Sequence, residues 1–390
     1  MKNVVISADP YVLFDEKTDT YYCYSTNDGV NKAFSIHKSK NLLDWEFVDY
    51  ALDLNHKNIW GKDWFWAPEC YYNPNNQYYY LFYSARVKDE LAYKYFNDSK
   101  YEETCKIGVA VSKSPTGPFI NITNEPMDYS PYDFEYLNVK GDDLFTISNN
   151  KYDKEAEKGN YIPAIDANLY FENDRIVLYF SRCCYCNCRY DEEFNRYIEA
   201  SNVACVELDT EWWYDPKAES MPKIKDEYIT YDNGRRKDKF ITLISYQNEP
   251  QAWENAHIDD YKVHETRRKN RRWSEGSTLF PIIKEGKKVY CITYSCNCYE
   301  DEDYAVGIAY SDNLLGPFKK DENNPIIKQE PNGVCSTGHG SLIIKDDKML
   351  YFLHARLKVG EPRILCVTEL NLKDKVGHNG IKICQLIDKI

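Results

Sequence analysis

The sequence contains no apolar run of about 18 residues, the length that a membrane-spanning helix needs. Its N-terminal stretch, MKNVVISADPYVLF, has one lysine and a short apolar segment before Asp9. That stretch lacks the longer apolar core of a secretory signal. We therefore expect a soluble, cytoplasmic chain without a membrane partner.

Clustered positive charge is also scarce. The net charge is -13, and lysine and arginine are scattered along the chain apart from the short run at 267–272. A protein that binds a nucleic-acid backbone needs a basic patch to neutralise phosphates. The charge pattern therefore argues against a nucleic-acid partner.

Cysteine is too sparse for a disulfide scaffold, with 14 in 390 residues, under 4%. Several cysteines stand inside apolar runs, which predicts small buried side chains in a reducing compartment. The cysteines at 183–188 and 296–298 could instead gather around zinc. Zinc sites usually space cysteines by two to four residues and close a four-ligand set, so the structural interpretation is favoured.

Three common catalytic motifs are absent: G-x-S-x-G, H-E-x-x-H and the P-loop. Lipase-like, zinc-protease and nucleotide-dependent activities therefore have no support. The sequence is instead rich in aromatic residues, at 15% of the chain with 35 tyrosines. Aromatic residues favour strands, so the composition predicts a globular, β-rich protein.

A hairpin pattern occurs five times along the chain. Each copy has a polar residue, an apolar strand, a turn rich in Asn, Asp, Gly or Lys, and a second, aromatic strand. The copies span 9–25, 68–84, 165–183, 275–295 and 339–354. The fourth copy is longer by about four residues, which we assign to its turn or to a bulge near Pro281.

Each hairpin is followed by a third alternating strand and often by a short fourth strand that starts at an aromatic residue. These segments are 33–48, 106–122, 201–213, 304–320 and 362–374. Five repeats of four antiparallel strands predict a five-bladed β-propeller, an all-β fold. We expect one domain over residues 1–390, with long ordered loop insertions at 128–165 and 183–273 in the second to fourth blades.

In a propeller, the first strand of every blade lines the central channel, so the starts of the five hairpins are expected to converge. These starts hold Asp9, Glu69 (or the Ala67-Pro68 before it), Asp166, Glu275 and His339. Clustered carboxylates raise at least one pKa, which supplies a proton donor and an ionised base together. Glycosidic-bond cleavage needs this pair.

Each residue also has a simpler explanation. Asp9 precedes Pro10, a common way to open a turn, and Glu275 could be a solvated loop residue. His339 could be a satisfied polar core group. Trp66 and its aromatic neighbours could pack between blades or stack on a sugar ring. The coincidence of three acids at one phase of the repeat favours function.

The motifs resemble those of family 43 glycoside hydrolases, five-bladed propellers that act on arabinan and xylan side chains. The resemblance covers nearly the whole chain. No single motif is specific, but all of them occur in order. They are Ala8-Asp9-Pro10-Tyr11, 39–45 (SKNLLDW), Trp66-Ala67-Pro68-Glu69, Ile165-Asp166-Ala167, Ser274-Glu275-Gly276, Tyr304-Ala305-Val306-Gly307, Leu315-Gly316-Pro317-Phe318 and Gly338-His339-Gly340-Ser341.

The resemblance implies roles for the three acids. It makes Asp9 the general base, Glu275 the general acid, and Asp166 the residue that tunes the pKa of the acid and orients it. The family inverts anomeric configuration, which implies a separation of about 6.5 to 9.5 Å between the base and the acid. Many members hold calcium on the axis through a histidine and waters, which implies a possible calcium ion near His339.

The resemblance leaves substrate recognition less defined. Phe34, Trp66, Glu69 and Arg356 are the candidate substrate-binding residues. No second β-sandwich follows the propeller, which mildly favours an exo-acting α-L-arabinofuranosidase on arabino- or arabinoxylo-oligosaccharides. A β-D-xylosidase, or an enzyme with both activities, is the alternative, and a catalytically silent carbohydrate-binding propeller is a more remote one.

Overall fold

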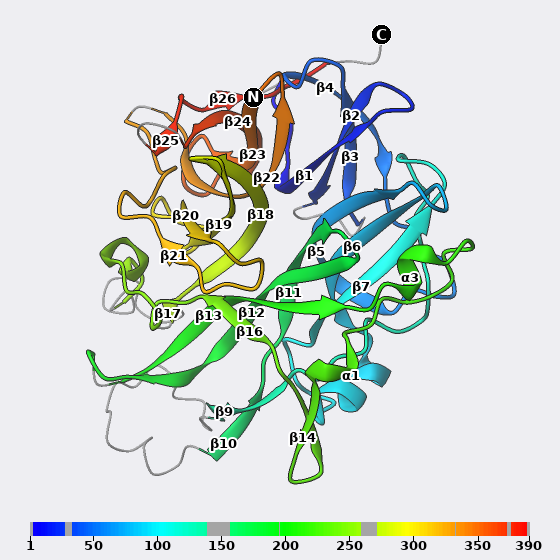
Figure 1. The fold of residues 1–390 in the computed structure, drawn as a ribbon, viewed down its shortest axis with the longest axis vertical. Coiled ribbons are helices and arrows are strands. Elements are labelled where there is room, and N and C mark those ends of the chain that lie inside the picture. The colour runs from blue at the N-terminus through cyan, green and yellow to red at the C-terminus, as the bar shows by residue number, and fades with distance from the viewer. Residues whose placement is uncertain are drawn as a thin grey trace.

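The structure is a computed structural model that describes residues 3–27, 33–138, 157–194, 196–258, 271–331, 333–372 and 376–387. Its main sheets radiate from a common centre, around which the strands β1, β5, β11, β18 and β22 stand (Figure 1). This is the five-bladed β-propeller that the repeat predicts.

The two innermost strands of each blade are the five predicted hairpins. In chain order they are β1 (Ala8–Asp15) with β2 (Thr20–Thr26), β5 (Gly61–Asn73) with β6 (Tyr78–Val87), β11 (Ala164–Glu172) with β12 (Arg175–Asp191), β18 (Ser274–Lys284) with β19 (Lys287–Cys296), and β22 (Cys335–Lys345) with β23 (Lys348–Arg356). The third strands are β3 (Ser35–Ser39), β7 (Cys105–Ser112), β13 (Arg196–Leu208), β20 (Ala305–Ser311) and β24 (Ile364–Asn371).

The outermost strands are short. They are β4 (Asp44–Tyr50), β8 (Ile120–Asn121), β16 (Ile241–Ile244), β21 (Lys319–Lys320) and β25 (Gly377–His378). The third blade departs from the prediction, because the segment after β13 forms the helical turn α3 (Glu211–Tyr214) instead of a fourth strand. The place of that strand is taken by β16, which returns only after an insertion.

The longer fourth hairpin has its extra residues in the strands and not in the turn. Lys284 pairs with Lys287, so the turn is the two-residue Glu285-Gly286, and Pro281 pairs with Tyr290 within the ladder. The expectation of a longer turn, or of a bulge at Pro281, is therefore wrong.

The ring closes between the last blade and the first. The C-terminal strand β27 (Gln385–Leu386) lies parallel to β4, and Val4 and Ile6 near the N-terminus bridge to Gln385 and Ile364. In Figure 1 the red C-terminal segment accordingly runs across to the blue first blade. Because both ends of the chain join the same seam, the last blade is held to the first by backbone hydrogen bonds.

Hydrophobic clusters fill the gap between every pair of neighbouring blades. The cysteines predicted to be buried are free and fully buried in these cores; they are Cys23, Cys70, Cys205, Cys291 and Cys366. Many tyrosines are also fully buried, with hydroxyl groups that reach partners, as Tyr24 does at the carbonyl of Pro115 (2.5 Å). The aromatic composition therefore serves the interblade packing.

The insertions form small ordered elements beside the blades. They include α1 (Asp89–Phe96), β9 (Tyr132–Asn138) with β10 (Glu157–Tyr161), η1 (Asp226–Tyr228), β14 (Ile229–Asp232) with β15 (Arg235–Asp238), η2 (Ala252–Asn255) and β17 (Arg271–Arg272). Buried Arg182 of β12 pairs with buried Asp133 of β9 at 2.8 Å, which ties that hairpin to the third blade. None of the helices in the described ranges has the length and apolarity to span a membrane.

Every inner strand carries the same irregularity at the end that faces the axis, and β5 and β22 carry further register shifts closer to their first residues. The register with the second strand shifts by one residue, and the residue at the shift has a positive φ. These residues are Asp9, Ala67, Asp166, Gly276 and His339, with φ of 48°, 48°, 59°, 57° and 40°. Such a β-bulge bends the strand and turns consecutive side chains toward one face.

The backbone N–H of each bulge residue is bonded to a side chain of the preceding blade. The acceptors are Thr26 for Ala67, Ser84 for Asp166, Ser181 for Gly276, Ser295 for His339 and His354 for Asp9, at 2.8, 3.0, 3.1, 2.8 and 3.1 Å. All five acceptors occupy the same position near the end of a second strand. A buried N–H needs a partner, so these bonds stabilise both the bulges and the contacts between blades.

Gly340 allows β22 to approach β23 closely, because a Cβ added there would lie 1.8 Å from the backbone oxygen of Phe352. Gly340→Ala should therefore destabilise the fold by about 1–3 kcal/mol, the usual cost of overpacking. The measurement is the free energy of unfolding in urea. Gly377→Ala, where an added Cβ meets nothing within 4 Å, is the matched control. Equal stability of the two variants would contradict the steric explanation.

Candidate active site

A cavity of about 210 Å³ lies where the starts of the inner strands converge on the axis. It is lined by Asp9, Trp66, Ile165, Asp166, Trp273, Glu275, Tyr299, Tyr304, His339 and Arg363. All three predicted acids therefore face one cavity, and each is less than 10% exposed, at 8%, 6% and 7% for Asp9, Asp166 and Glu275. Three carboxylates in one buried space are the chemically unusual feature of the molecule.

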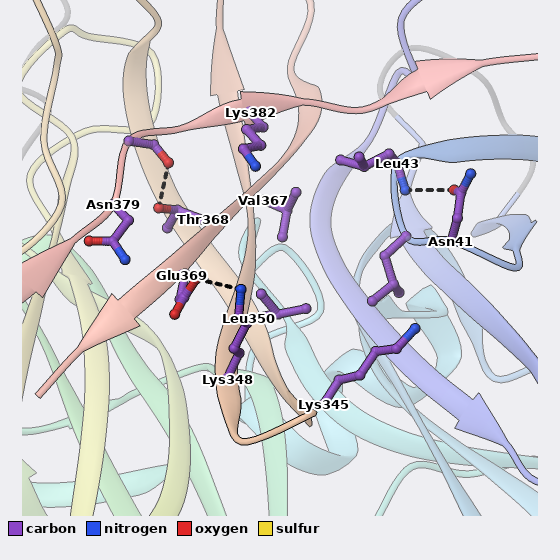
Figure 2. A pocket seen from close by; sticks show the side chains of 12 residues that line it. Asn41, Leu43, Lys345, Lys348, Leu350, Val367, Thr368, Glu369, Asn379 and Lys382 are labelled. Carbon is purple, nitrogen blue, oxygen red and sulfur yellow. Dashed lines mark hydrogen bonds and ion pairs between the residues drawn. The ribbon is translucent and has the colours of Figure 1, made fainter.

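A second hollow, of about 270 Å³, lies at the seam between the fifth and first blades. Figure 2 shows Lys345, Lys348 and Lys382 around it. The single acid in its lining, Glu369, lies 3.6 Å from the ammonium group of Lys348. This hollow has no second carboxylate to act with Glu369, so it lacks the acid and base that glycosidic cleavage needs.

The bulges determine which side chains reach the axial cavity. Asp9, Asp166 and His339 are the bulge residues of their blades. Glu275 stands one residue before the bulge residue of its blade, the position that Trp66 and Ile165 hold in theirs. The expectation that the three acids share one phase of the repeat is therefore wrong by one residue. They still meet, because a bulge presents two successive side chains to the same side.

Asp9 has the most cationic surroundings of the three acids. Its Oδ1 atom lies 2.9 Å from the Arg363 guanidinium and 3.5 Å from Nδ1 of His339. Burial raises the pKa of Asp9, but the charges of Arg363 and His339 outweigh burial and hold this pKa well below its usual range. Asp9 is therefore ionised at neutral pH.

Glu275 has the opposite environment. Burial and the neighbouring charge of Asp166 raise its pKa to about 8, while the hydroxyl of Tyr304, which donates to Oε1 at 2.9 Å, partly offsets this rise. Burial also raises the pKa of Asp166, against the charge of His339 and a hydrogen bond from Ser181. Glu275 is therefore protonated at neutral pH beside an ionised Asp9, and it can act as a proton donor.

Two glycines make room for this arrangement. A Cβ at Gly276 would lie 2.7 Å from the ring of His339, and a Cβ at Gly338 would lie 2.1 Å from the ring of Tyr304. Tyr304 in turn stacks on His354, with ring centroids 5.6 Å apart and planes at 9°. The glycines of the two sequence motifs therefore allow the close approach of the side chains that surround Asp9 and Glu275.

Five lining residues were not among the predicted site residues: Ile165, Trp273, Tyr299, Tyr304 and Arg363. Tyr304 stands in one of the quoted motifs and Trp273 precedes the Ser-Glu-Gly motif, so both had a signal next to them. Arg363 lies at the start of the predicted third strand of the last blade, 354 residues from the Asp9 that it contacts. No local pattern in the sequence marks that contact.

Three predicted substrate-binding residues do not line the cavity. Phe34 is fully buried and packs on Phe65 and Tyr83, so its ring belongs to the core. Glu69 points between blades, where it accepts a hydrogen bond from Asn168 at 3.1 Å, and burial raises its pKa to about 8. These positions do not support direct contact with a substrate.

Arg356 also points elsewhere, because its guanidinium donates to the backbone oxygens of Tyr299 and Glu361. Arg356 thus supports the loop that carries Tyr299 and does not itself reach the cavity. Trp66 is the one predicted substrate-binding residue in the lining. Its ring stacks on Trp64 at 4.9 Å, and Trp64 is covered by Arg86 at 4.1 Å.

The insertion before Glu275 is anchored by buried charge. The Arg272 guanidinium donates to Asn255 at 2.6 Å, pairs with Asp191, and lies over the ring of Tyr246 at 3.7 Å. These contacts hold β12, η2 and the strand that enters the site together. They place the next residue, Trp273, in the wall of the cavity.

The predicted calcium ion has little support from the residues around His339. Calcium takes about six to eight oxygen ligands. Over the described ranges, no group of three His, Cys, Asp or Glu side chains is placed to hold a metal ion. His339 with Asp9 does not form such a site alone, so calcium stays a prediction. Cys183, Cys296 and Cys298 of the alternative zinc site are free and buried, and the side chains of 184–188 lie outside the described residues, so zinc there also stays a hypothesis.

The propeller and its acid-lined cavity fit a glycoside hydrolase, and comparison with known proteins shows this class and its family. The family described as glycosyl hydrolases family 43 matches residues 1–140 and 223–374. The chain therefore belongs to this family, as its motifs suggest. A comparison with curated proteins finds no match.

Solved structures agree with this assignment. A thermostable family-43 glycoside hydrolase is 25% identical, with a TM-score of 0.65, and the match covers 98% of this chain and 96% of that one. An endo-1,4-beta-xylanase from Bacteroides thetaiotaomicron (24%, TM-score 0.62, 98% and 98% coverage) and an alpha-L-arabinofuranosidase from Lactobacillus brevis (16%, 0.56, 96% and 94%) share the fold.

Tyr304→Phe tests the electrostatics of the site. The hydroxyl of Tyr304 lowers the pKa of Glu275, so its loss should move the alkaline limb of kcat/KM from about pH 8 to higher pH by about half a unit to one unit. Tyr290→Phe is the control. It removes the 2.6 Å hydrogen bond from Tyr290 of β19 to Glu172 of β11, away from the cavity, and should leave the alkaline limb in place. If the alkaline limb of Tyr304→Phe stays in place or moves to lower pH, the account in which the Tyr304 hydroxyl lowers the pKa of Glu275 is contradicted.

Proposed function

We propose that the protein is an inverting, exo-acting glycoside hydrolase that releases α-L-arabinofuranosyl residues from arabino- or arabinoxylo-oligosaccharides. The observation that carries this proposal is the division of charge in the axial cavity. Asp9, whose pKa lies well below its usual range, faces the same space as Glu275, whose pKa is raised to about 8. A family-43 enzyme needs both states at once.

In the proposed reaction, Asp9 removes a proton from a water molecule that attacks the anomeric carbon. Glu275 gives its proton to the leaving glycosidic oxygen as that bond breaks. Asp166 does not touch the bond: its charge keeps the pKa of Glu275 high, so the acid still holds its proton at neutral pH. After the reaction Asp9 carries the proton taken from water, and Glu275 has lost its proton to the leaving oxygen. Asp9 must therefore release a proton to solvent, and Glu275 must take one up, before the next turnover.

The shape of the cavity supports exo-action. Its volume of about 210 Å³ lies below the roughly 300–1,000 Å³ of sites for drug-sized ligands, so it fits about one sugar residue. Trp66 and Trp273 in its wall offer ring faces on which the C–H groups of a sugar can stack. A cavity that takes one sugar residue suits an exo-enzyme, which removes the terminal sugar of a chain.

Activity on 4-nitrophenyl α-L-arabinofuranoside with little on 4-nitrophenyl β-D-xylopyranoside is the expected result. The reverse preference would replace the proposal by a β-D-xylosidase, and comparable rates would indicate both activities. Hydrolysis of neither glycoside, or of oligosaccharides only at internal bonds, would contradict the proposal. Binding of oligosaccharides without hydrolysis would favour the silent carbohydrate-binding propeller.

Glu275→Gln should lower kcat by about 10²–10⁴-fold, because the amide has no proton of suitable acidity for the leaving oxygen. The loss should be smaller on the nitrophenyl substrate, whose leaving group needs less protonation, than on an oligosaccharide. Glu172→Gln changes a carboxylate at the far end of the inner strand β11 and should keep the wild-type rate. Unchanged activity of Glu275→Gln would remove this residue from the mechanism.

A further inference from the structure

Ser181 differs from the other side chains that bind the bulge N–H groups. It stands in β12, directly opposite Ile165 of the inner strand, and its hydroxyl accepts the N–H of Gly276 at 3.1 Å. Its own proton is directed at Oδ2 of Asp166, 2.7 Å away. One hydroxyl therefore joins the carboxylate of Asp166 to the residue that follows Glu275.

We infer that Ser181 is a positioning residue that fixes the orientation of Asp166 relative to Glu275. This inference rests on the proposed function, in which Asp166 acts through Glu275. The residue is new to the site: it does not line the cavity, and neither the sequence motifs nor the comparisons assign it a role.

The geometry leaves the Asp166 carboxylate little freedom. Oδ2 receives the hydroxyl of Ser181 and lies 3.2 Å from the N–H of Gly276, which Ser181 shares. Ser181 is fully buried, so no water replaces its hydroxyl without rearrangement. Because both donors approach the same oxygen, that oxygen is held toward the fourth blade and toward Glu275.

The bond also favours the ionised form of Asp166, because a hydroxyl donates a stronger hydrogen bond to a charged carboxylate oxygen than to a neutral carboxyl group. The titratable groups that face Asp166 are Asp9 of β1, Glu69 of β5, Cys105 of β7, Cys183 of β12, Glu275 of β18, Tyr304, and His339 of β22. Loss of the Ser181 hydroxyl should reduce the negative charge beside Glu275 and lower the pKa of that acid.

Thr26 provides a matched control for the structural part of this role. Its hydroxyl occupies the equivalent position in the first blade and accepts the N–H of Ala67 at 2.8 Å. Ala67 has no carboxylate, so Thr26→Val removes the same kind of interblade bond without touching Asp166. Both variants should lose thermal stability, and only a change at Ser181 should displace the alkaline limb.

The test compares Ser181→Ala, Ser181→Thr and Thr26→Val by kcat, by the pH profile of kcat/KM and by Tm between pH 5 and 9. Ser181→Ala should lower kcat about ten- to hundredfold, the equivalent of losing one hydrogen bond to a charged group. Its alkaline limb should move to lower pH by about half a unit or more. Ser181→Thr keeps the hydroxyl and should keep the wild-type limb, and Thr26→Val, which leaves Asp166 and Glu275 untouched, should also keep the limb.

The dependence of Tm on pH gives a readout that needs no substrate. Glu275 binds its proton more tightly in the folded than in the unfolded chain, so its contribution to stability is lost as pH rises through about 8. In Ser181→Ala this loss should occur at lower pH. If Ser181→Ala does not fold, Ser181→Cys, whose S–H group is a weak donor, takes its place. In Ser181→Cys both the alkaline limb of kcat/KM and the pH dependence of Tm must move to lower pH.

The outcomes separate the two proposals. A wild-type protein without glycosidase activity contradicts the proposed function, and the displacement in Tm still decides the role of Ser181. An active wild type in which Ser181→Ala keeps its kcat, its alkaline limb and its dependence of Tm on pH, or changes them only as Thr26→Val does, would overturn the positioning role.

Discussion

Five backbone N–H groups, one at the bulge of each inner strand, depend on a side chain of the preceding blade for their hydrogen bond. This constraint couples the local shape of each strand to the packing of the whole ring. A bulge residue that left its N–H buried without a partner would cost about 1–3 kcal/mol. Because each N–H has its partner, all five blades contain the bulge. The bulge turns two successive side chains of each blade toward the axis.

The site is a consequence of that arrangement. The bulges bring Asp9, Asp166 and Glu275 into one small cavity, where burial and mutual repulsion raise the free energy of any fully ionised state. Arg363 and His339 lie closest to Asp9, and only for Asp9 do their charges outweigh burial. Asp9 and Glu275 therefore differ in charge at neutral pH, the first ionised and the second protonated. A buried carboxylate cluster costs stability, and the proposed function gives a reason for its presence.

The blades could be predicted from the sequence because alternation of apolar residues and turn chemistry are local signals that recur with each hairpin. Asp9, Asp166 and Glu275 could be located for the same reason, since each stands at a strand start. The one-residue offset of Glu275 could not, because a bulge depends on an acceptor in another blade. Arg363 was missed because its partner lies 354 residues away.

The errors have physical causes as well. Phe34 has a positive φ of 57°, which turns its ring into the core instead of toward the axis. Helical turn α3 replaced a predicted strand because tertiary packing outweighs the strand preference of its aromatic residues: Trp212 is buried against Tyr80 and Phe82. The direction of the Phe34 ring and the helical turn at α3 depend on contacts between residues distant in sequence. A local sequence pattern does not contain that information.

The anomeric configuration of the first-formed sugar tests the central claim, that an ionised Asp9 and a protonated Glu275 act on opposite sides of one bond. Proton NMR during the first minutes of hydrolysis, before mutarotation, reads this configuration directly. We predict that an α-L-arabinofuranoside releases β-L-arabinofuranose first. Release of the α-anomer first would contradict the account, because retention requires a carboxylate that attacks carbon and not one that activates water.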